Sequence, residues 1–229
     1  MLTKRESENH LLSPRAAMLR CEIDHLTITA PSLALGAAYV ERSLGVALQP
    51  GGEHPRMGTQ NLLLKLGDAL FLEVIAVNPA AVRPPRPRWF ALDELGAETA
   101  PRLAHWVART SAIRSAPIDY LDLVGPIEPM TRGALQWLIT IPVDGALPLG
   151  GAAPALIEWQ TPGHPAAGLQ DKGCALRGFE IAHAEPQRVR TLLGTLGLGA
   201  EVHIVPLRAG EPTRLLARIE TPVGLRTLG

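Results

Sequence analysis

The clearest hydrophobic pattern in the chain lies between residues 23 and 76. Residues 23–30 alternate in polarity with the two-residue period of a β-strand. Residues 33–44 carry an apolar stripe with helical spacing, and Gly45 follows as a helix-ending residue. The other expected elements are strands near 46–49, at 61–66 and at 70–76, with turns at 51–52 and 67–68. This order predicts one β-α-β-β-β module.

A weaker copy of the same order follows at residues 103–160. A strand is expected at 103–109, and Pro117 interrupts the short helix that Ser111 could cap. The other expected elements are strands near 126–130, at 134–141 and at 155–160. The two halves therefore form a degenerate internal repeat.

A histidine and a glutamate recur at matching places in the two halves. When the strands are aligned, His25 falls on His105 and Glu73 falls on Glu158. A carboxylate in a strand is costly to bury unless it is paired or bound to a cation. For one residue alone, a solvated strand face is the ordinary explanation. The matched pair instead indicates a metal-centred site for a small molecule.

The segments outside the two modules have different patterns. Residues 1–20 lack the apolar run of a signal peptide and are expected to form a flexible tail. Repeated prolines at 78–102 favour a Pro/Arg-rich connector on the surface. Residues 174–229 predict a β-α-β-β unit, with a further short strand at 223–228 as an open addition. The modules at 21–77 and 103–160 and this unit are expected to form one domain over 21–229.

Composition and charge exclude several classes of partner. The 229 residues include 22 Lys or Arg and 22 Asp or Glu, so no excess positive charge favours nucleic acid or an anionic membrane. No apolar run is long enough to span a bilayer. The two cysteines show no disulfide framework, which favours a cytoplasmic protein with reduced thiols. Phosphate-binding glycine motifs are absent, so no nucleotide cofactor is expected.

Several segments together resemble one known family. They are IDHLTITAP, HPRMGTQN and LFLEVIA in the first half, and RPRWFALDE and LIEWQ later in the chain. This sequence is similar to the glyoxalase-like domain of the vicinal oxygen chelate (glyoxalase/bleomycin resistance/dioxygenase) superfamily over most of 22–229. The resemblance implies an α+β fold. Paired βαβββ modules curl into a cup-like mixed sheet, and the C-terminal βαββ unit is additional.

The resemblance also implies a ligand set and a chemistry. In metal-dependent members, the ligands come from the first and last strands of each module, which here are His25, Glu73, His105 and Glu158. Such a set suits Ni, Zn, Mn, Fe or Co. Glu158 or Glu73 would then act as catalytic base in isomerase or lyase chemistry on a small, oxygen-rich metabolite, through an enediolate-like intermediate.

Two other functions remain open at this stage. A metal-free binding or sequestration protein would use a cup lined by tryptophans, although strand alternation turns Trp106 and Trp159 away from the expected ligands. An extradiol-type dioxygenase would hold iron with His25, His105 and one glutamate. Homodimerisation through exposed sheet edges is also open. The candidate substrate contacts are His54, Thr59, Asn61 and Gln136.

Two loop features receive structural interpretations. Trp89 and Phe90 are expected to anchor the connector, with the alternative that Arg88 and Trp89 edge a ligand pocket. His164 precedes a proline and is expected in a surface turn.

Overall fold

The first βαβββ module is present in the structure, a computed structural model that describes residues 19–208 and 210–229. Of the predicted N-terminal tail, residues 1–18 lie outside the described residues. The module consists of β1 (Glu22–Thr29), α1 (Leu33–Leu44), β2 (Gln49–His54), β3 (Thr59–Gly67) and β4 (Leu70–Val77).

The second module has the same order of elements with a shorter helix. A 3-10 turn at Ile113–Ser115 is followed by Pro117, after which the helix begins. Because proline lacks an N–H and fixes its own φ, it suits the start of a helix and not its interior. The module consists of β5 (Arg102–Arg109), α2 (Ile118–Val124), β6 (Ile127–Arg132), β7 (Leu135–Thr140) and β8 (Ala155–Trp159).

The C-terminal unit confirms the predicted βαββ order and the additional short strand. It consists of β9 (Ala175–His183), α3 (Pro186–Thr195), β10 (His203–Pro206), β11 (Arg214–Thr221) and β12 (Gly224–Leu228). The connector contains a 3-10 helix at Trp89–Glu94, and two further 3-10 helices lie at Pro148–Gly151 and Pro165–Gly168.

The strands form two sheets. The two modules share a curled eight-stranded sheet with the order β2-β3-β4-β1-β5-β8-β7-β6, and β10-β9-β11-β12 form the second sheet. In each module the first strand pairs in parallel with the last, as β1 with β4 and β5 with β8. The modules join through the antiparallel pair of β1 and β5. The predicted α+β fold of paired modules with an additional unit is therefore confirmed.

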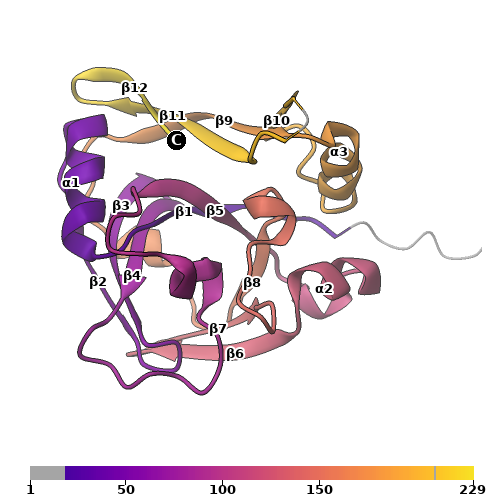
Figure 1. Ribbon diagram of the computed structural model, residues 1–229, viewed down its shortest axis with the longest axis horizontal. Helices are drawn as coiled ribbons and strands as arrows, with labels where there is room; N and C mark the ends of the chain where they lie inside the picture. Colours follow the sequence, from indigo (N-terminus) through magenta and orange to yellow (C-terminus); the bar gives the residue numbers. More distant parts are fainter. Residues whose placement is uncertain (1–18, 209) are drawn as a thin grey trace, which may run out of the picture.

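Each face of the large sheet carries its own hydrophobic core. The outer core lies between this sheet, the helices and the small sheet, which crosses above β1 and β5 in Figure 1. Trp106 is fully buried there, and its indole N–H donates to the Ala152 carbonyl at 3.2 Å. The inner core fills the cup with Met57, Trp89 and Trp137, among others. Strand alternation thus supplies two cores from one sheet.

The expected turn at residues 51–52 is wrong, because both glycines lie inside β2. The pairing of β2 with β3 shifts register between Pro50 and Gly52, which marks a β-bulge. A Cβ on Gly51 would lie 2.2 Å from Asn61 Oδ1, so the bulge needs a residue without a side chain there. The glycine pair therefore indicates close backbone approach within a strand.

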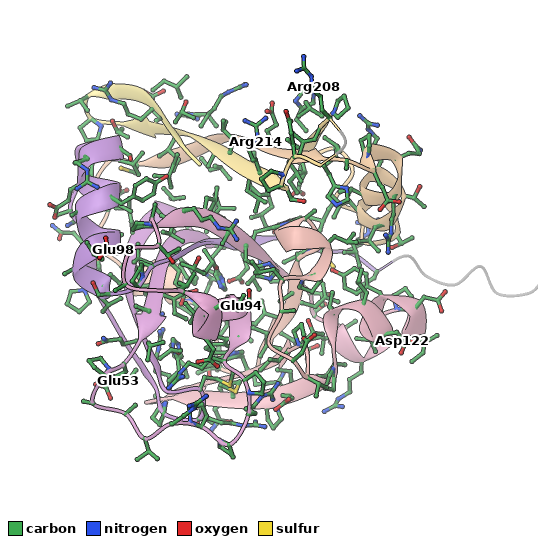
Figure 2. The ribbon with its side chains drawn as sticks, viewed as in Figure 1. Glu53, Glu94, Glu98, Asp122, Arg208 and Arg214 are labelled. Carbon is green, nitrogen blue, oxygen red and sulfur yellow. The ribbon has the colours of Figure 1, made fainter. Side chains whose placement is uncertain are left out.

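Charged side chains lie mainly on the outside of the molecule. Figure 2 labels examples such as Glu53 on β2 and Asp122 on α2, and both are exposed. None of the helices in the described segments combines the length and the apolar character needed to cross a membrane.

Two helical glycines should respond oppositely to alanine. In α1, a Cβ on Gly36 would lie 2.3 Å from Val74 Cγ1, so we expect Gly36→Ala to lower the free energy of unfolding by about 1–3 kcal/mol. In α3, Gly194 has open space around its Cα, so Gly194→Ala should raise stability by about 0.5–1 kcal/mol. Urea unfolding of both variants checks the prediction, and destabilisation by Gly194→Ala would contradict it.

Candidate active site

A small cavity lies inside the cup, between strands of both modules. Its volume is about 30 Å³. The polar lining comes from β1, β2, β3, β4 and β6, and the apolar lining comes mainly from the connector, β7 and β8. The polar lining residues are His25, His54, Asn61, Glu73 and Arg132.

A β-bulge in β1 places Asp24 beside His25. The pairing of β1 with β5 shifts register between Ile23 and His25, so the usual alternation of faces is broken at Asp24. Asp24 Oδ1 lies 2.6 Å from His25 Nδ1. His25 is also stacked on Phe71, with ring centroids 4.5 Å apart. The ring is therefore held both at its edge and on its face.

Asp24 is a fully buried carboxylate with three hydrogen-bond donors. Besides His25, it accepts from Trp159 Nε1 at 2.8 Å and from His164 Nε2 at 3.0 Å, both at Oδ2. Burial raises the pKa of Asp24, but the hydrogen bonds and charges of His164 and His25 outweigh it and hold this pKa well below its usual range. An ionised carboxylate only accepts, so His25 Nδ1 carries a proton and Nε2 faces the cavity.

Glu73 is the second buried carboxylate of the cavity. Its Oε1 accepts from Asn61 Nδ2 at 2.6 Å, and its Oε2 accepts from Thr27 Oγ1 at 3.4 Å. Its Oε2 also lies 3.7 Å from His25 Nε2. An imidazole nitrogen and a carboxylate oxygen thus approach each other at one point of the cavity wall, on the neighbouring strands β1 and β4.

His54 is held as a neutral ring between the two edges of the cup. Its Nδ1 is 3.2 Å from Thr59 Oγ1, and its Nε2 accepts from Arg132 Nη1 at 3.4 Å. Burial lowers the pKa of His54 to about 4. Arg132 Nη1 also donates to Asn61 Oδ1 at 3.2 Å. His54 and Asn61 therefore line the cavity, whereas Thr59 is buried behind His54, and the expectation that they contact substrate stays a prediction.

Aromatic rings form the rest of the wall. Trp89 and Phe90 anchor the connector in the inner core, and they also line the cavity. Arg88 does not line it and instead pairs with Asp93. Trp159 also faces the cavity and packs 5.4 Å from Trp137, centroid to centroid. The expectation that Trp159 points away is therefore wrong, while the same expectation for Trp106 agrees with its place in the outer core.

Glu158 lies on the opposite face of the sheet from His25. Its Oε2 accepts from the Ile113 amide at 2.8 Å, and its Oε1 accepts from Gln160 Nε2 at 2.8 Å. Matching Glu158 to Glu73 places β8 one residue out of register, and a one-residue slip turns every side chain to the other face. Gln136 is likewise exposed on β7 while Trp137 points inward. The structure thus corrects the placement of both residues.

His105 is buried beside the cavity. Its Nε2 accepts from the Ala155 amide at 3.2 Å, and within the described residues its Nδ1 has no hydrogen-bond partner. Burial lowers its pKa to about 3. Its ring packs against Phe90, with centroids 5.0 Å apart. His105 is therefore a neutral core histidine in this structure.

The predicted four-ligand metal site does not fit this arrangement. His25 Nε2 and Glu73 Oε2 converge, but His105 is bonded to a backbone amide and Glu158 lies across the sheet. Across residues 19–208 and 210–229, no three His, Cys, Asp or Glu side chains are grouped to hold a metal ion. The iron triad of a dioxygenase requires the same His105, so it does not fit either.

Three residues of the candidate site escaped the sequence patterns. Asp24 and His164 belong to the hydrogen-bond network of His25, although His164 looked like part of a surface turn. Arg132 lies at the end of an edge strand and reaches across to β2 and β3. The available signal for Asp24 was its position directly before His25, whereas no local pattern marked the other two.

Comparison with protein families identifies the class of this fold and site. A family model described as a glyoxalase-like domain matches residues 23–197. The chain belongs to this glyoxalase-like domain family, and the resemblance to a glyoxalase-like domain seen in the sequence is confirmed. The curated proteins provide no match.

Several solved structures are similar in fold. A hypothetical protein from Staphylococcus aureus has a TM-score of 0.50 and 13% identity, over 77% of this chain and 75% of that one. A Streptomyces coelicolor methylmalonyl-CoA epimerase in complex with 2-nitronate-propionyl-CoA has a TM-score of 0.40 and 18% identity, over 63% and 100%. The epimerase from Mycobacterium tuberculosis has a TM-score of 0.37 and 16% identity, over 66% and 92%. At these identities the likeness concerns the fold alone.

The Gly51 contact predicts a variant that disturbs Glu73 indirectly. Because a Cβ at Gly51 would collide with Asn61 Oδ1, Gly51→Ala should displace the amide that donates to Glu73. We expect a loss of about 1–3 kcal/mol in the free energy of unfolding. Gly178→Ala in β9, where the nearest atoms lie 4.0 Å from the added Cβ, is the matched control. Equal urea midpoints for the two variants would refute the collision.

The neutral His105 predicts a pH-dependent stability. Its folded pKa of about 3 lies below the unfolded value of about 6.5, so the unfolded chain binds a proton first as pH falls. Stability is full above pH 6.5 and declines toward pH 3, by about 2 kcal/mol between pH 6.5 and pH 5 from this group. Urea unfolding at several pH values checks this prediction, because the free energy of unfolding of His105→Gln should fall less between pH 6.5 and pH 5 than that of wild type.

The exposed His203 provides a control for this experiment. His203→Gln also removes one histidine, but from the surface of β10, so it controls for the substitution of histidine by glutamine without a change in the buried core. An identical decline in wild type and His105→Gln would show that burial of His105 does not govern acid stability.

Proposed function

We propose that the protein catalyses isomerase- or lyase-type proton transfer on a small, oxygen-rich metabolite. The observation that supports this most directly is the 3.7 Å approach of His25 Nε2 to Glu73 Oε2 on one cavity wall. Asp24 holds the imidazole in a single orientation, and Asn61 and Thr27 do the same for the carboxylate. Fixed acid and base groups within reach of one substrate are the requirement for general acid-base catalysis.

The proposed reaction divides the protons between the two groups. Glu73 takes a proton from a carbon next to the substrate carbonyl, while protonated His25 donates from Nε2 to the carbonyl oxygen. These two transfers produce an enediol. Return of the carbon proton to the neighbouring carbon by Glu73, and recovery of a hydroxyl proton by His25, give the isomer and restore both groups. Loss of a leaving group from the same intermediate gives lyase chemistry.

The arrangement favours proton transfer on one face of the substrate. β1 and β4 are adjacent, and both side chains point from the same face of the sheet into the cavity. A proton can therefore be removed from one carbon and returned to its neighbour from the same side. Inverting a single carbon would instead require an acid on the opposite side of the substrate from Glu73.

Binding without turnover is the second candidate function. The observation that favours it is the aromatic wall, because Trp89, Trp137 and Trp159 offer flat apolar surfaces with few conformations to lose on binding. A sequestration protein would need this wall but not the approach of His25 to Glu73.

Hydrogen exchange in deuterated water separates the two functions. Small α-hydroxy aldehydes, ketones and acids are incubated with the protein, and loss of the signal from the hydrogen next to the carbonyl is followed by proton NMR. We expect exchange with at least one compound, reduced about 10²- to 10⁴-fold in His25→Gln and Glu73→Gln.

Two matched variants control for general effects of the substitutions. Glu158→Gln removes a carboxylate on the far face of the sheet, and His203→Gln removes an exposed histidine, so both should exchange at the wild-type rate. If His25→Gln and Glu73→Gln exchanged as fast as these controls, proton transfer by the pair would be refuted. Binding with no exchange in wild type would favour sequestration.

A further inference from the structure

We infer that the ligand of the cavity is a small carboxylate, such as a 2-oxo or 2-hydroxy acid, and that Arg132 binds its carboxylate group. This inference deepens the proposed function, because it takes the same cavity as the active site. It assigns Arg132 the role of selecting the charge of the substrate. It leaves the proton transfers with His25 and Glu73.

Arg132 differs from the other arginines around the cup. Arg56 and Arg86 both pair with Glu128, and Arg88 pairs with Asp93. Among the described residues, no carboxylate forms an ion pair with Arg132. The guanidinium nevertheless lines the cavity and is only partly exposed. A charge in this position lacks the anionic partner that its neighbours have.

The guanidinium retains hydrogen-bonding capacity. An arginine has five N–H donors in a rigid fork. Its hydrogen bonds to described residues all use Nη1, which donates to Asn61 Oδ1 and His54 Nε2. Burial lowers the pKa of Arg132, and the nearby charge of Glu73 opposes this effect. The remaining donors suit the two oxygens of a planar carboxylate, which arginine binds in bidentate fashion.

The backbone of β2 makes room for this side chain. A Cβ on Gly52 would lie 2.9 Å from Arg132 Cδ, so the glycine in the β2 bulge permits the arginine to cross from β6. Asn61 then lies between the two charged groups, accepting from Arg132 and donating to Glu73. A carboxylate held by Arg132 would therefore place its neighbouring carbon toward Glu73. In a 2-hydroxy acid this carbon carries the hydrogen that Glu73 would take. In a 2-oxo acid it is the carbonyl carbon, and the hydrogen that Glu73 would take is on the next carbon.

The test compares charged and neutral probes of the same shape. Pyruvate and lactate are titrated by calorimetry against pyruvamide and lactamide, which lack the negative charge. We expect the carboxylates to bind wild type about 10- to 100-fold more tightly than the amides. Arg132→Gln should abolish this preference, and Arg132→Lys should retain part of it because the positive charge remains.

Arg56→Gln is the matched control, because it removes a neighbouring arginine that already has Glu128 as partner. It should keep the wild-type preference for carboxylates. Circular dichroism confirms that each variant is folded, and Gly52→Ala offers a second route, since it displaces the Arg132 side chain without removing its charge. Gly52→Ala should also weaken carboxylate binding.

The outcomes separate this inference from the proposed function. Three results would overturn the inference. Wild type could bind carboxylates and amides equally, folded Arg132→Gln could keep the full preference for carboxylates, or neither carboxylate could bind. Carboxylate binding that depends on Arg132, together with no hydrogen exchange, would sustain it and refute catalysis. Exchange on neutral compounds alone would sustain catalysis and overturn the assignment of Arg132.

Discussion

The buried carboxylate of Asp24 is the interaction on which the candidate site depends. It has no exposed surface and accepts hydrogen bonds from His25, Trp159 and His164, which come from β1, β8 and a loop that follows β8. Without it, three buried or partly buried donors would lose their partner, and each unsatisfied donor costs about 1–3 kcal/mol. One carboxylate therefore binds Nδ1 of a histidine, which orients the ring, and joins the two modules behind the cavity.

The curl of the large sheet brings its two edge strands close together at the cavity. Arg132 reaches from β6 to His54 and Asn61, and Arg56 donates to the carbonyl of Pro129 on β6 at 2.6 Å. Since β2 and β6 are not paired through a backbone ladder in the described structure, hydrogen bonds donated by arginine side chains bridge this seam. The polar groups of the first module consequently share one small cavity with Arg132 and with aromatic side chains of the connector and the second module.

The sequence predicted the fold well because the fold depends on coarse patterns. Both modules, the connector and the C-terminal unit followed from hydrophobic period, proline and glycine, and the family resemblance over most of 22–229 extended this prediction to the cup. Strand alternation placed His25 and Glu73 on the face opposite Leu26, Ile28, Leu72 and Val74, and in the structure both side chains line the cavity. A fold predicted from such patterns stays correct even when the predicted end of a helix or strand is wrong by one residue.

The parts of the site that sequence could not predict depend on register and on contacts distant in the chain. Glu158 was matched to Glu73 by residue type, but β8 turns Ile157 and Trp159 inward instead. Asp24 faces the site only because β1 has a bulge, and a bulge is not visible in a two-residue period. Arg132 meets Asn61 across 71 positions of sequence, a proximity that only the closed cup creates.

The two modules contribute different kinds of side chain to the cavity that they share. The titratable pair His25 and Glu73 belongs to the first module, whereas the second supplies Trp137, Trp159 and the cation Arg132. Substitutions in β6, β7 and β8 can therefore change the shape and the charge of the cavity wall while the strands that carry His25 and Glu73 stay unchanged. In a fold made of two similar modules, this asymmetry allows the residues that contact a ligand to change in one module while the other module keeps its sequence.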